Sequence, residues 1–196
     1  MRIEIENANV RLLPTVLILA SGRGVRFSAS GGTVHKLQAD LAGKPVLQHT
    51  LDAVRASGLP WHLEDVGHAG MGDSIAAAVR ATPTASGWMI LPGDLPLVRP
   101  ETLRCIASAA SGPVTVPRYE GQRGHPVCFT AECGPKLMIL KGEKGAARVL
   151  LAYAAMGFVA FIEVDDVGIV TDIDTTADLQ RAHMLLAERS RQGSGR

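Results

Sequence analysis

The sequence has few aromatic residues, few cysteines and almost no net charge. Only 4% of its 196 residues are aromatic, so Ala, Leu and Val have to fill the core. The three cysteines, Cys105, Cys128 and Cys133, fit neither a disulfide framework nor a zinc site, which predicts reduced thiols in a cytoplasmic protein. A net charge of +1 gives no general attraction to nucleic acid or to a membrane surface. Any affinity for phosphate must therefore be local.

Long apolar runs are also missing. No segment approaches the roughly 18 apolar residues that a transmembrane helix needs, and charges between Arg2 and Arg11 interrupt any signal-peptide core. We find no internal repeat and no low-complexity segment. A chain of 196 residues is expected to form one domain, which we place at residues 1–190, with a flexible tail at 191–196 in a polar stretch that starts at Glu188.

What is present is an alternation of strand and helix signals. Short apolar runs predict strands at 15–20, 62–66, 88–92, 113–117, 125–129 and 158–164. Apolar residues at helical spacing predict helices at 46–57, 73–81, 100–110 and 145–156, and a last helix that opens at Thr175. This alternation predicts a single three-layer α/β domain of the Rossmann-like kind, in which helices cover both faces of a mostly parallel sheet.

The most informative segment follows the first expected strand. It reads Ser21-Gly22-Arg23-Gly24-Val25-Arg26-Phe27. Glycine lets backbone N–H groups approach an anion, and arginine adds charge and hydrogen bonds, so the loop is suited to a polyphosphate. Phe27 occupies the place of the third glycine of a dinucleotide fingerprint, and no Gly-Lys-Ser/Thr follows as in a P-loop. A bare G-x-G also fits an ordinary strand–helix turn, but Lys36 downstream favours a phosphate site.

One carboxylate, Asp94, follows the expected strand 88–92 through a Pro-Gly pair. Open α/β sheets bind ligands beyond the carboxyl ends of their strands, and Mg²⁺ uses a carboxylate beside a polyphosphate. The alternative is an aspartate in an ordinary turn.

A second group of carboxylates lies in Thr171-Asp-Ile-Asp-Thr-Thr-Ala-Asp178. We expect Asp172 and Asp174 to point to opposite faces of a short extended segment. Only one of them can then face a site, and Asp174 is the better placed second metal ligand. Asp178 has capping-box spacing from Thr175 and is expected to cap the last helix.

Three further segments have open interpretations. His125, between glycine and proline, could contact substrate, orient a loop or be structural. Residues 142–148 precede a helix and could bind an anion at its N-terminus, or form a glycine turn with a charged surface. The small residues at 28–33 indicate a loop or a lid.

Together and in order, these segments resemble the MobA-like nucleotidyltransferases, most closely the molybdenum cofactor cytidylyltransferase branch. The resemblance spans about residues 15–187 and rests on Leu19-Ala-Ser-Gly-Arg-Gly-Val-Arg-Phe27, Lys36-Leu37, Gly70-Met-Gly-Asp-Ser-Ile75, Leu91-Pro-Gly-Asp94-Leu-Pro, Arg123-Gly-His-Pro126 and Asp172-Ile-Asp-Thr-Thr-Ala-Asp-Leu179. The Arg-Gly-His-Pro motif favours the cytidylyl over the guanylyl branch. The chain departs from the family pattern in its longer stretch between Arg26 and Lys36, in Glu143, where Asp is usual, and in Arg148, one place late.

The resemblance implies a nucleotide-diphospho-sugar transferase-like fold and a Mg²⁺-dependent reaction. A nucleoside monophosphate would pass from an NTP, by the branch CTP, to a phosphate-bearing acceptor of the molybdopterin type, with release of pyrophosphate. The implied roles are nucleotide binding by Leu19, Ala20, Ser21, Gly22, Arg23, Gly24, Gly70, Gly72 and Ser74, catalysis by Arg26, Lys36 and Asp94, metal binding by Asp94 and Asp174, and acceptor contact by His125 and Arg148. The branch also implies a partner enzyme that receives the finished cofactor.

Two other kinds of function stay open at this point. A guanylyltransferase or sugar-phosphate nucleotidyltransferase would use the same phosphate and metal groups. A nucleotide-binding regulator without turnover would need fewer of them, and the joint retention of Lys36, Asp94 and Asp174 argues against it.

Overall fold

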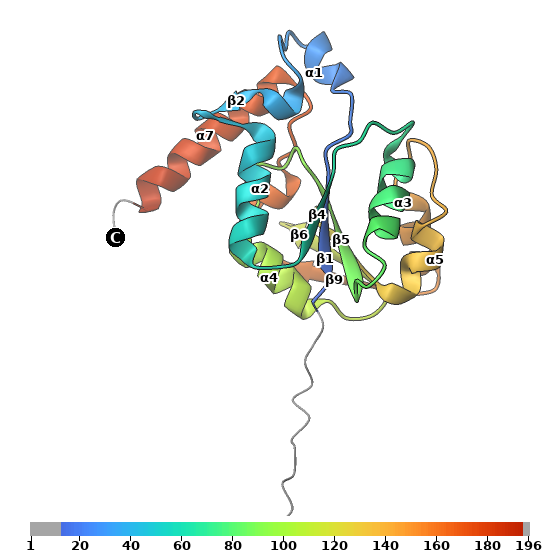
Figure 1. The fold of residues 1–196 in the computed structure, drawn as a ribbon. Coiled ribbons are helices and arrows are strands. Elements are labelled where there is room, and N and C mark those ends of the chain that lie inside the picture. The colour runs from blue at the N-terminus through green and yellow to red at the C-terminus, as the bar shows by residue number, and fades with distance from the viewer. Residues whose placement is uncertain (1–12, 194–196) are drawn as a thin grey trace, which may run out of the picture.

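The computed structural model describes residues 13–193, with a seven-stranded sheet at its centre (Figure 1). The strand order is β4-β1-β5-β8-β6-β7, and β9 pairs with β6. The strands of the sheet are β1 (Thr15–Leu19), β4 (Trp61–Glu64), β5 (Gly87–Pro92), β6 (Val114–Tyr119), β7 (Gln122–Arg123), β8 (Val127–Thr130) and β9 (Val159–Glu163). The expected strands are therefore confirmed to within about two residues at each end.

The sheet is mixed, with parallel pairs around one central antiparallel strand. Strand β1 runs parallel to β4 and β5, and β6 runs parallel to β9. Strand β8 pairs antiparallel with both β5 and β6. A short connection can join neighbouring strands only when they are antiparallel, and the chain turns back from β6 within a few residues. The short strand β7 and a separate hairpin of β2 (Asp40–Leu41) and β3 (Lys44–Pro45) were not among the expected elements.

Helices cover both faces of this sheet, as the sequence predicts. In Figure 1, α2 and α4 lie on one face, and α3 and α5 lie on the other. The helices are α1 (Val25–Ala29), α2 (Val46–Ser57), α3 (Met71–Ala81), α4 (Pro100–Ala109), α5 (Gly134–Leu137), α6 (Ala147–Ala155) and α7 (Thr176–Gly193). Three short 3-10 helices are η1 (Lys36–Gln38), η2 (Ala131–Cys133) and η3 (Val167–Val170).

The residues of β1 show how one apolar run serves both faces. Val16 and Ile18 pack in the cluster that contains α2 and α4 residues, whereas Leu17 and Leu19 pack in the cluster that contains α3 and α6 residues. Successive side chains of a strand point to opposite faces, so a strand covered on both sides has to be apolar throughout.

The C-terminal end differs from expectation. Helix α7 continues to Gly193, so residues 191–193, expected in a flexible tail, are helical, while residues 1–12 and 194–196 lie outside the described part. Arg189 anchors this end of the helix because it donates to the Leu97 carbonyl at 2.5 Å and to Asp166 at 2.9 Å. Within residues 13–193, no helix combines the length and apolar character that crossing a membrane requires.

Parallel strands β1 and β5 end at the same edge of the sheet, at Leu19 and Pro92, which are aligned in register. This edge lies at the top of Figure 1, beneath α1. Ligands of open α/β sheets bind in the crevice beyond such strand ends. The loops that follow β1 and β5 are therefore the first place to look for a site.

Candidate active site

Three neighbouring cavities lie at this edge. The main cavity has a volume of about 600 Å³. It is lined by residues of the 21–27 segment, which we call the anion loop, by Asp94 and by the 169–174 segment. A small chamber of about 150 Å³ lies between the anion loop and the start of α3. An apolar chamber of about 260 Å³ extends toward α6. Met71 and Pro92 line all three, so the three cavities lie side by side.

Asp94 is held in the main cavity by its neighbour Gly93. The Gly93 N–H donates to the Leu19 carbonyl at 2.8 Å, and Thr50 donates to the Gly93 carbonyl at 3.0 Å. A Cβ on Gly93 would approach the Leu47 side chain to 2.9 Å and the Leu19 carbonyl to 3.1 Å. Only glycine therefore lets the chain pass this closely to the end of β1.

The 172–174 segment is attached directly to Asp94. The backbone N–H of Ile173 donates to the Asp94 carbonyl at 3.0 Å, and the Ile173 side chain is fully buried. Asp172 and Asp174 flank this buried residue and both line the main cavity. The expectation that only one of them can face a site is wrong, because side chains two positions apart in extended backbone share a face.

Asp178 caps α7, as expected from its spacing. Its carboxylate accepts from the Thr175 N–H at 2.7 Å and from the Thr175 hydroxyl at 2.7 Å, and the Asp178 N–H donates back to that hydroxyl at 3.2 Å. It also accepts from the Asp174 N–H at 3.2 Å. The cap therefore fixes the backbone that carries Asp174.

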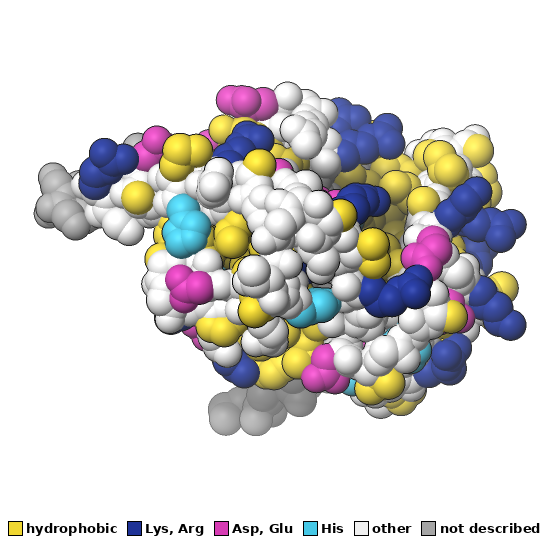
Figure 2. Space-filling model, turned by 90° about the horizontal axis from the view of Figure 1, so that it is seen from above, with side chains coloured by type: hydrophobic (Ala, Val, Ile, Leu, Met, Phe, Trp, Pro, Cys, Tyr) yellow, Lys and Arg dark blue, Asp and Glu magenta, His cyan; other side chains and the backbone are white. Residues whose placement is uncertain are grey.

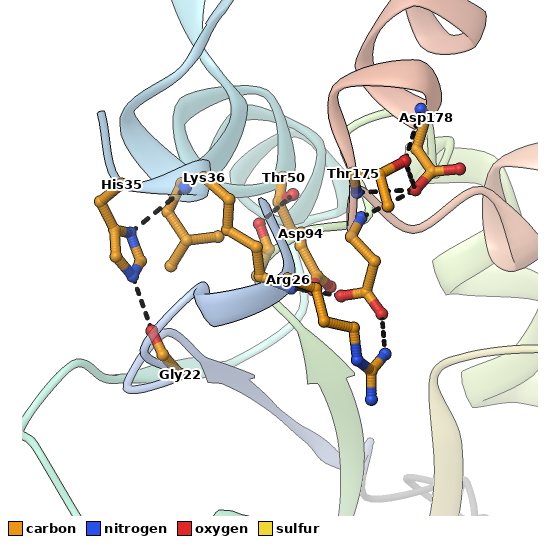
Figure 3. A network of polar contacts seen from close by, with 11 residues as sticks. Gly22, Arg26, His35, Lys36, Thr50, Asp94, Thr175 and Asp178 are labelled. Carbon is orange, nitrogen blue, oxygen red and sulfur yellow. Dashed lines mark hydrogen bonds and ion pairs between the residues drawn. The ribbon is translucent and has the colours of Figure 1, made fainter. Parts of the chain in front are cut away.

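Lys36 lies between the two carboxylates. Its Nζ donates to Asp94 at 2.5 Å and to Asp174 at 2.8 Å, and Arg26 pairs with the other oxygen of Asp174. Figure 3 shows the side chains of Arg26, Lys36 and Asp94 converging from separate elements. Only 12% of the Lys36 side chain and 14% of the Asp94 side chain are exposed.

The charges of this group change the pKa values of its members. Burial lowers the pKa of Lys36, but Asp94 and Asp174 together outweigh that effect and raise it above the ordinary value. Burial raises the pKa of Asp174, but Lys36 and Arg26 together hold it below the ordinary range. Lys36 and Asp174 thus each stabilise the charged form of the other.

His35 positions Lys36, a role that the sequence did not suggest. Its Nδ1 accepts from the Leu37 N–H at 3.3 Å at the start of η1, and its Nε2 bonds the Gly22 carbonyl at 2.6 Å (Figure 3). The preceding loop is also attached, because Ser30 forms two hydrogen bonds with Thr176. The 28–33 segment, expected to be a loop or a lid, includes the end of α1 and is docked on α7.

The anion loop faces α3 across the small chamber. The hydroxyls of Ser21 and Ser74 are 2.6 Å apart, and both residues line this chamber with Gly22 and Gly70. Arg23, which is largely exposed, pairs with Glu143 at 3.9 Å across the opening. The loop is shorter than its sequence suggests, because Val25–Ala29 forms helix α1.

Other expected nucleotide-binding residues have different surroundings. Leu19 lines the small and apolar chambers, and Gly24 lines the main cavity. Gly72 packs against the backbone of Lys141 and donates to the Gly142 carbonyl at 2.7 Å, so it supports the chamber wall from behind. Ala20 and Gly72 are not among the residues that line the three cavities.

His125 separates the main cavity from the apolar chamber and lines both. Its backbone N–H donates to the Ile169 carbonyl at 2.9 Å. Burial lowers the pKa of its imidazole, although Asp94 and Asp172 act in the opposite direction. Arg148 does not join this group: its side chain is exposed, and it lines none of the three cavities.

Several lining residues were absent from the expected set. Gln122 and Arg123 on β7 line the main cavity, and His68 lines the small chamber. Arg123 belongs to the Arg-Gly-His-Pro motif, so that signal was available, whereas His68 belongs to no motif. Viewed from above in Figure 2, Lys and Arg side chains gather around the hollow at this edge. A cavity surrounded by cationic side chains and lined by the carboxylates of Asp94, Asp172 and Asp174 is suited to a polyphosphate and a divalent cation.

Comparison with known proteins agrees with this arrangement. Residues 53–156 match the family described as MobA-like NTP transferase domain. The bifunctional protein GlmU of Desulfitobacterium hafniense is 33% identical in an alignment of 109 positions that covers 45% of this chain and 23% of that protein. The purine catabolism protein PucB of Bacillus subtilis is 33% identical over 108 residues, which are 54% of this chain and 52% of that protein. The chain thus spans at most about half the length of these relatives.

The crystal structure of Rv0371c from Mycobacterium tuberculosis H37Rv is similar over nearly the whole described fold. Its TM-score is 0.73 at 25% identity, and the alignment covers 88% of this chain and 98% of Rv0371c. The family match itself begins at residue 53 and ends at 156, so it includes Asp94 and His125 but neither Lys36 nor Asp174. Since the matched segment is more than half of the sequence, the chain belongs to the MobA-like NTP transferase family.

Proposed function

We propose that this protein is a divalent-metal-dependent cytidylyltransferase that transfers CMP from CTP to a phosphate-bearing acceptor, with a molybdopterin-type cofactor as the first candidate. The observation that carries the proposal is the placement of Lys36 between Asp94 and Asp174, beside a cationic loop at the carboxyl end of β1 and β5. Nucleotidyl transfer has to bring two anions together. Lys36 and the arginines of the loop supply positive charge where these anions would meet.

The donor set fits a magnesium ion held jointly by protein and substrate. One carboxylate oxygen of Asp94, Oδ1, is buried without a hydrogen-bond partner among the described residues, which is costly unless a cation is bound there. Residues 13–193 hold no group of three metal-ligating side chains, so phosphate oxygens would complete the coordination. Mg²⁺ is commonly bound in this way, and the structural neighbour Rv0371c has been crystallised with manganese.

Asp94 and Asp174 would hold this ion, which when bound supplies positive charge at the α-phosphate and pyrophosphate oxygens. Arg23 and Arg26 extend from exposed positions over the main cavity and would bind the β- and γ-phosphates. Gly22 and Gly24 allow the backbone N–H groups of the loop to approach the same oxygens. The small chamber, which Ser21 and Ser74 line, would then receive the nucleoside.

The acceptor would enter the main cavity from the side of Arg123 and His125. An oxygen of its phosphate attacks the α-phosphorus, the bond to the β-phosphate oxygen breaks, and pyrophosphate carries away the negative charge. The attacking oxygen is already anionic, so no strong general base is needed, and positioning and cationic stabilisation supply most of the rate. Lys36 would move from its carboxylates toward the charge that develops on the pyrophosphate.

One argument supports the choice of CTP. The Arg123-Gly-His-Pro126 motif is typical of the cytidylyl branch, and its Arg123 and His125 lie in the main cavity. The acceptor is less constrained, because Arg123 would bind any phosphate. A sugar phosphate is the second candidate acceptor, and an enzyme that receives the finished cofactor is a further implied partner.

Thermal melting with nucleotides tests the first part of this proposal. A ligand that binds only the native state raises the melting temperature, and at equal concentration the tighter-binding ligand raises it more. CTP with Mg²⁺ should raise it more than GTP with Mg²⁺. The opposite order would contradict the cytidylyl assignment.

Pyrophosphate release tests turnover and the acceptor. The protein is incubated with CTP, Mg²⁺ and one acceptor at a time from a panel of sugar phosphates and a molybdopterin-type phosphate. The proposal predicts release with the molybdopterin type and a loss of about 10²–10³ in turnover for Asp94→Asn in a protein that remains folded. NTP binding without pyrophosphate release from any acceptor would instead indicate a nucleotide-binding regulator.

A further inference from the structure

His68 lines the small chamber and has no part in the proposed mechanism. We propose that His68, held by Glu64, selects the nucleobase by accepting a hydrogen bond from its exocyclic amino group, so that the chamber takes cytosine and rejects uracil. This inference rests on the proposed function, because it concerns the base of the same nucleotide. It adds a specificity-determining residue that no motif identifies.

His68 lies where a base would be read. It lines the small chamber with Ser21, Gly22, Gly70 and Ser74, which are the anion loop and the start of α3. The charged residues of this lining have other partners, because Lys36 pairs with Asp94 at 2.5 Å and Arg23 pairs with Glu143 at 3.9 Å. The two serine hydroxyls are 2.6 Å apart and bond each other. The imidazole is therefore the polar side chain of this chamber that the phosphate and metal groups leave available to distinguish one base from another. About 21% of its side chain is exposed, so it is accessible from the chamber.

Glu64 determines which nitrogen of His68 carries the proton. Glu64 ends β4 and is only 6% exposed, and its backbone carbonyl accepts from the Ala20 N–H at 2.8 Å. Its Oε1 lies 3.0 Å from Nε2 of His68, while its Oε2 lies 3.5 Å from Nε2 of His62. An ionised carboxylate can only accept hydrogen bonds, so Nε2 of His68 is the donor in this contact.

The remaining nitrogen of His68 then acts as an acceptor. In a neutral imidazole one nitrogen donates and the other accepts, so donation from Nε2 leaves Nδ1 with a free lone pair. Among the described residues, nothing donates to this Nδ1. Cytosine presents an amino donor at its C4 position, where uracil-type bases present a carbonyl acceptor. Nδ1 would accept a hydrogen bond from the amino group of cytosine and would repel the carbonyl oxygen of uracil.

The test is the ratio of the dissociation constants of UTP and CTP, measured by calorimetric titration with Mg²⁺. The two nucleotides share the triphosphate and the ribose, so the ratio isolates the base. Leaving a buried acceptor opposite an acceptor costs enough for about a ten- to hundredfold preference for CTP in the native protein. His68→Phe keeps the ring and its packing but removes both nitrogens, and should bring the ratio close to one.

Two variants sharpen this test. Glu64→Gln can donate as well as accept, which permits the other tautomer of His68, so the ratio should fall while His68 itself is intact. His68→Asn retains an acceptor close to the position of Nδ1 and should keep part of the preference, and it replaces His68→Phe if the larger ring prevents folding. The control is His183→Phe, which changes an exposed histidine on α7 outside the three cavities and should leave the ratio unchanged.

The outcomes separate the inference from the function on which it rests. If the native protein binds CTP but His68→Phe retains the full preference over UTP, or if GTP binds more tightly than CTP, this inference is wrong and NTP binding still stands. If no NTP binds the native protein with Mg²⁺, the proposed function itself fails.

Discussion

Replacing Lys36 by methionine would remove the cation that lies between Asp94 and Asp174 while keeping most of the side-chain volume. Both carboxylates contact the Lys36 ammonium, at 2.5 Å and 2.8 Å, and their side chains are 14% and 29% exposed. Removing one partner of a buried ion pair costs about 3–5 kcal/mol. Since Asp174 is partly exposed and keeps its contact with Arg26, we expect a smaller loss of about 2–4 kcal/mol.

For a domain of this size, such a loss lowers the melting temperature by about 5–15 °C. Differential scanning calorimetry without nucleotide measures it. Lys44→Met is the matched control, because Lys44 also pairs with a carboxylate at 2.8 Å but both side chains are about half exposed. Such a surface pair contributes about 0–1 kcal/mol, so the control should melt close to the native protein.

The same variant tests the expected position of the metal. Without Lys36, Asp94 loses its ion-pair partner and Asp174 keeps only Arg26, so Mg²⁺ or Mn²⁺ alone should raise the melting temperature of Lys36→Met more than that of the native protein. Turnover should fall, by about 10²–10³, because a charge that stabilises the transition state is lost. If Lys36→Met melts like Lys44→Met, shows no greater response to metal and retains activity, Lys36 does not have the position and role proposed for it.

Three more predictions concern other parts of the structure. Burial lowers the pKa of His125, so the contribution of His125 to stability is present above the unfolded pKa of about 6.5 and is lost as the pH falls. Between pH 7 and 5 the melting temperature of the native protein should therefore fall further than that of His125→Gln, and parallel pH profiles would contradict this. Arg189→Met removes a hydrogen bond of 2.9 Å from the fully buried Asp166 side chain, which should lower the free energy of unfolding by about 1–3 kcal/mol. The exposed control Arg191→Met should cost under about 0.5 kcal/mol, and equal effects of the two variants would contradict the anchoring role of Arg189. A Cβ on Gly70 would lie 2.4 Å from facing backbone, so Gly70→Ala should lower both the melting temperature and CTP affinity, and native CTP binding by this variant would show that the chamber wall adjusts.

The fold was predictable because its signals are local. Strand β1 is buried at every residue and apolar from Val16 to Leu19. Leu47, Leu51 and Val54 have helical spacing, and they lie on the side of α2 that packs on the sheet. The antiparallel direction of β8 was not predictable in the same way, because an apolar run has the same pattern in either direction. The continuation of α7 depends on Arg189 and its buried partner Asp166, which are 23 residues apart.

The candidate site was predictable where one residue type in one motif suffices, as for Asp94 and for the anion loop. It was not predictable where the geometry depends on contacts across the chain. His35 positions Lys36 through a bond to Gly22, and Asp172 faces the cavity because Ile173 is buried between the two aspartates. Arg148 was expected near the acceptor from its place in a motif, but the start of α6 turns it to the surface.

The measurement that tests the central claim most directly is the dependence of CTP binding on Mg²⁺ in the native protein and in Asp94→Asn, by calorimetric titration of proteins shown to be folded. If Asp94 joins the metal to the nucleotide, Mg²⁺ should strengthen CTP binding by the native protein strongly, and this strengthening should be largely lost in the variant. Equal strengthening in both proteins, or CTP binding by the native protein that does not respond to Mg²⁺, would contradict the account.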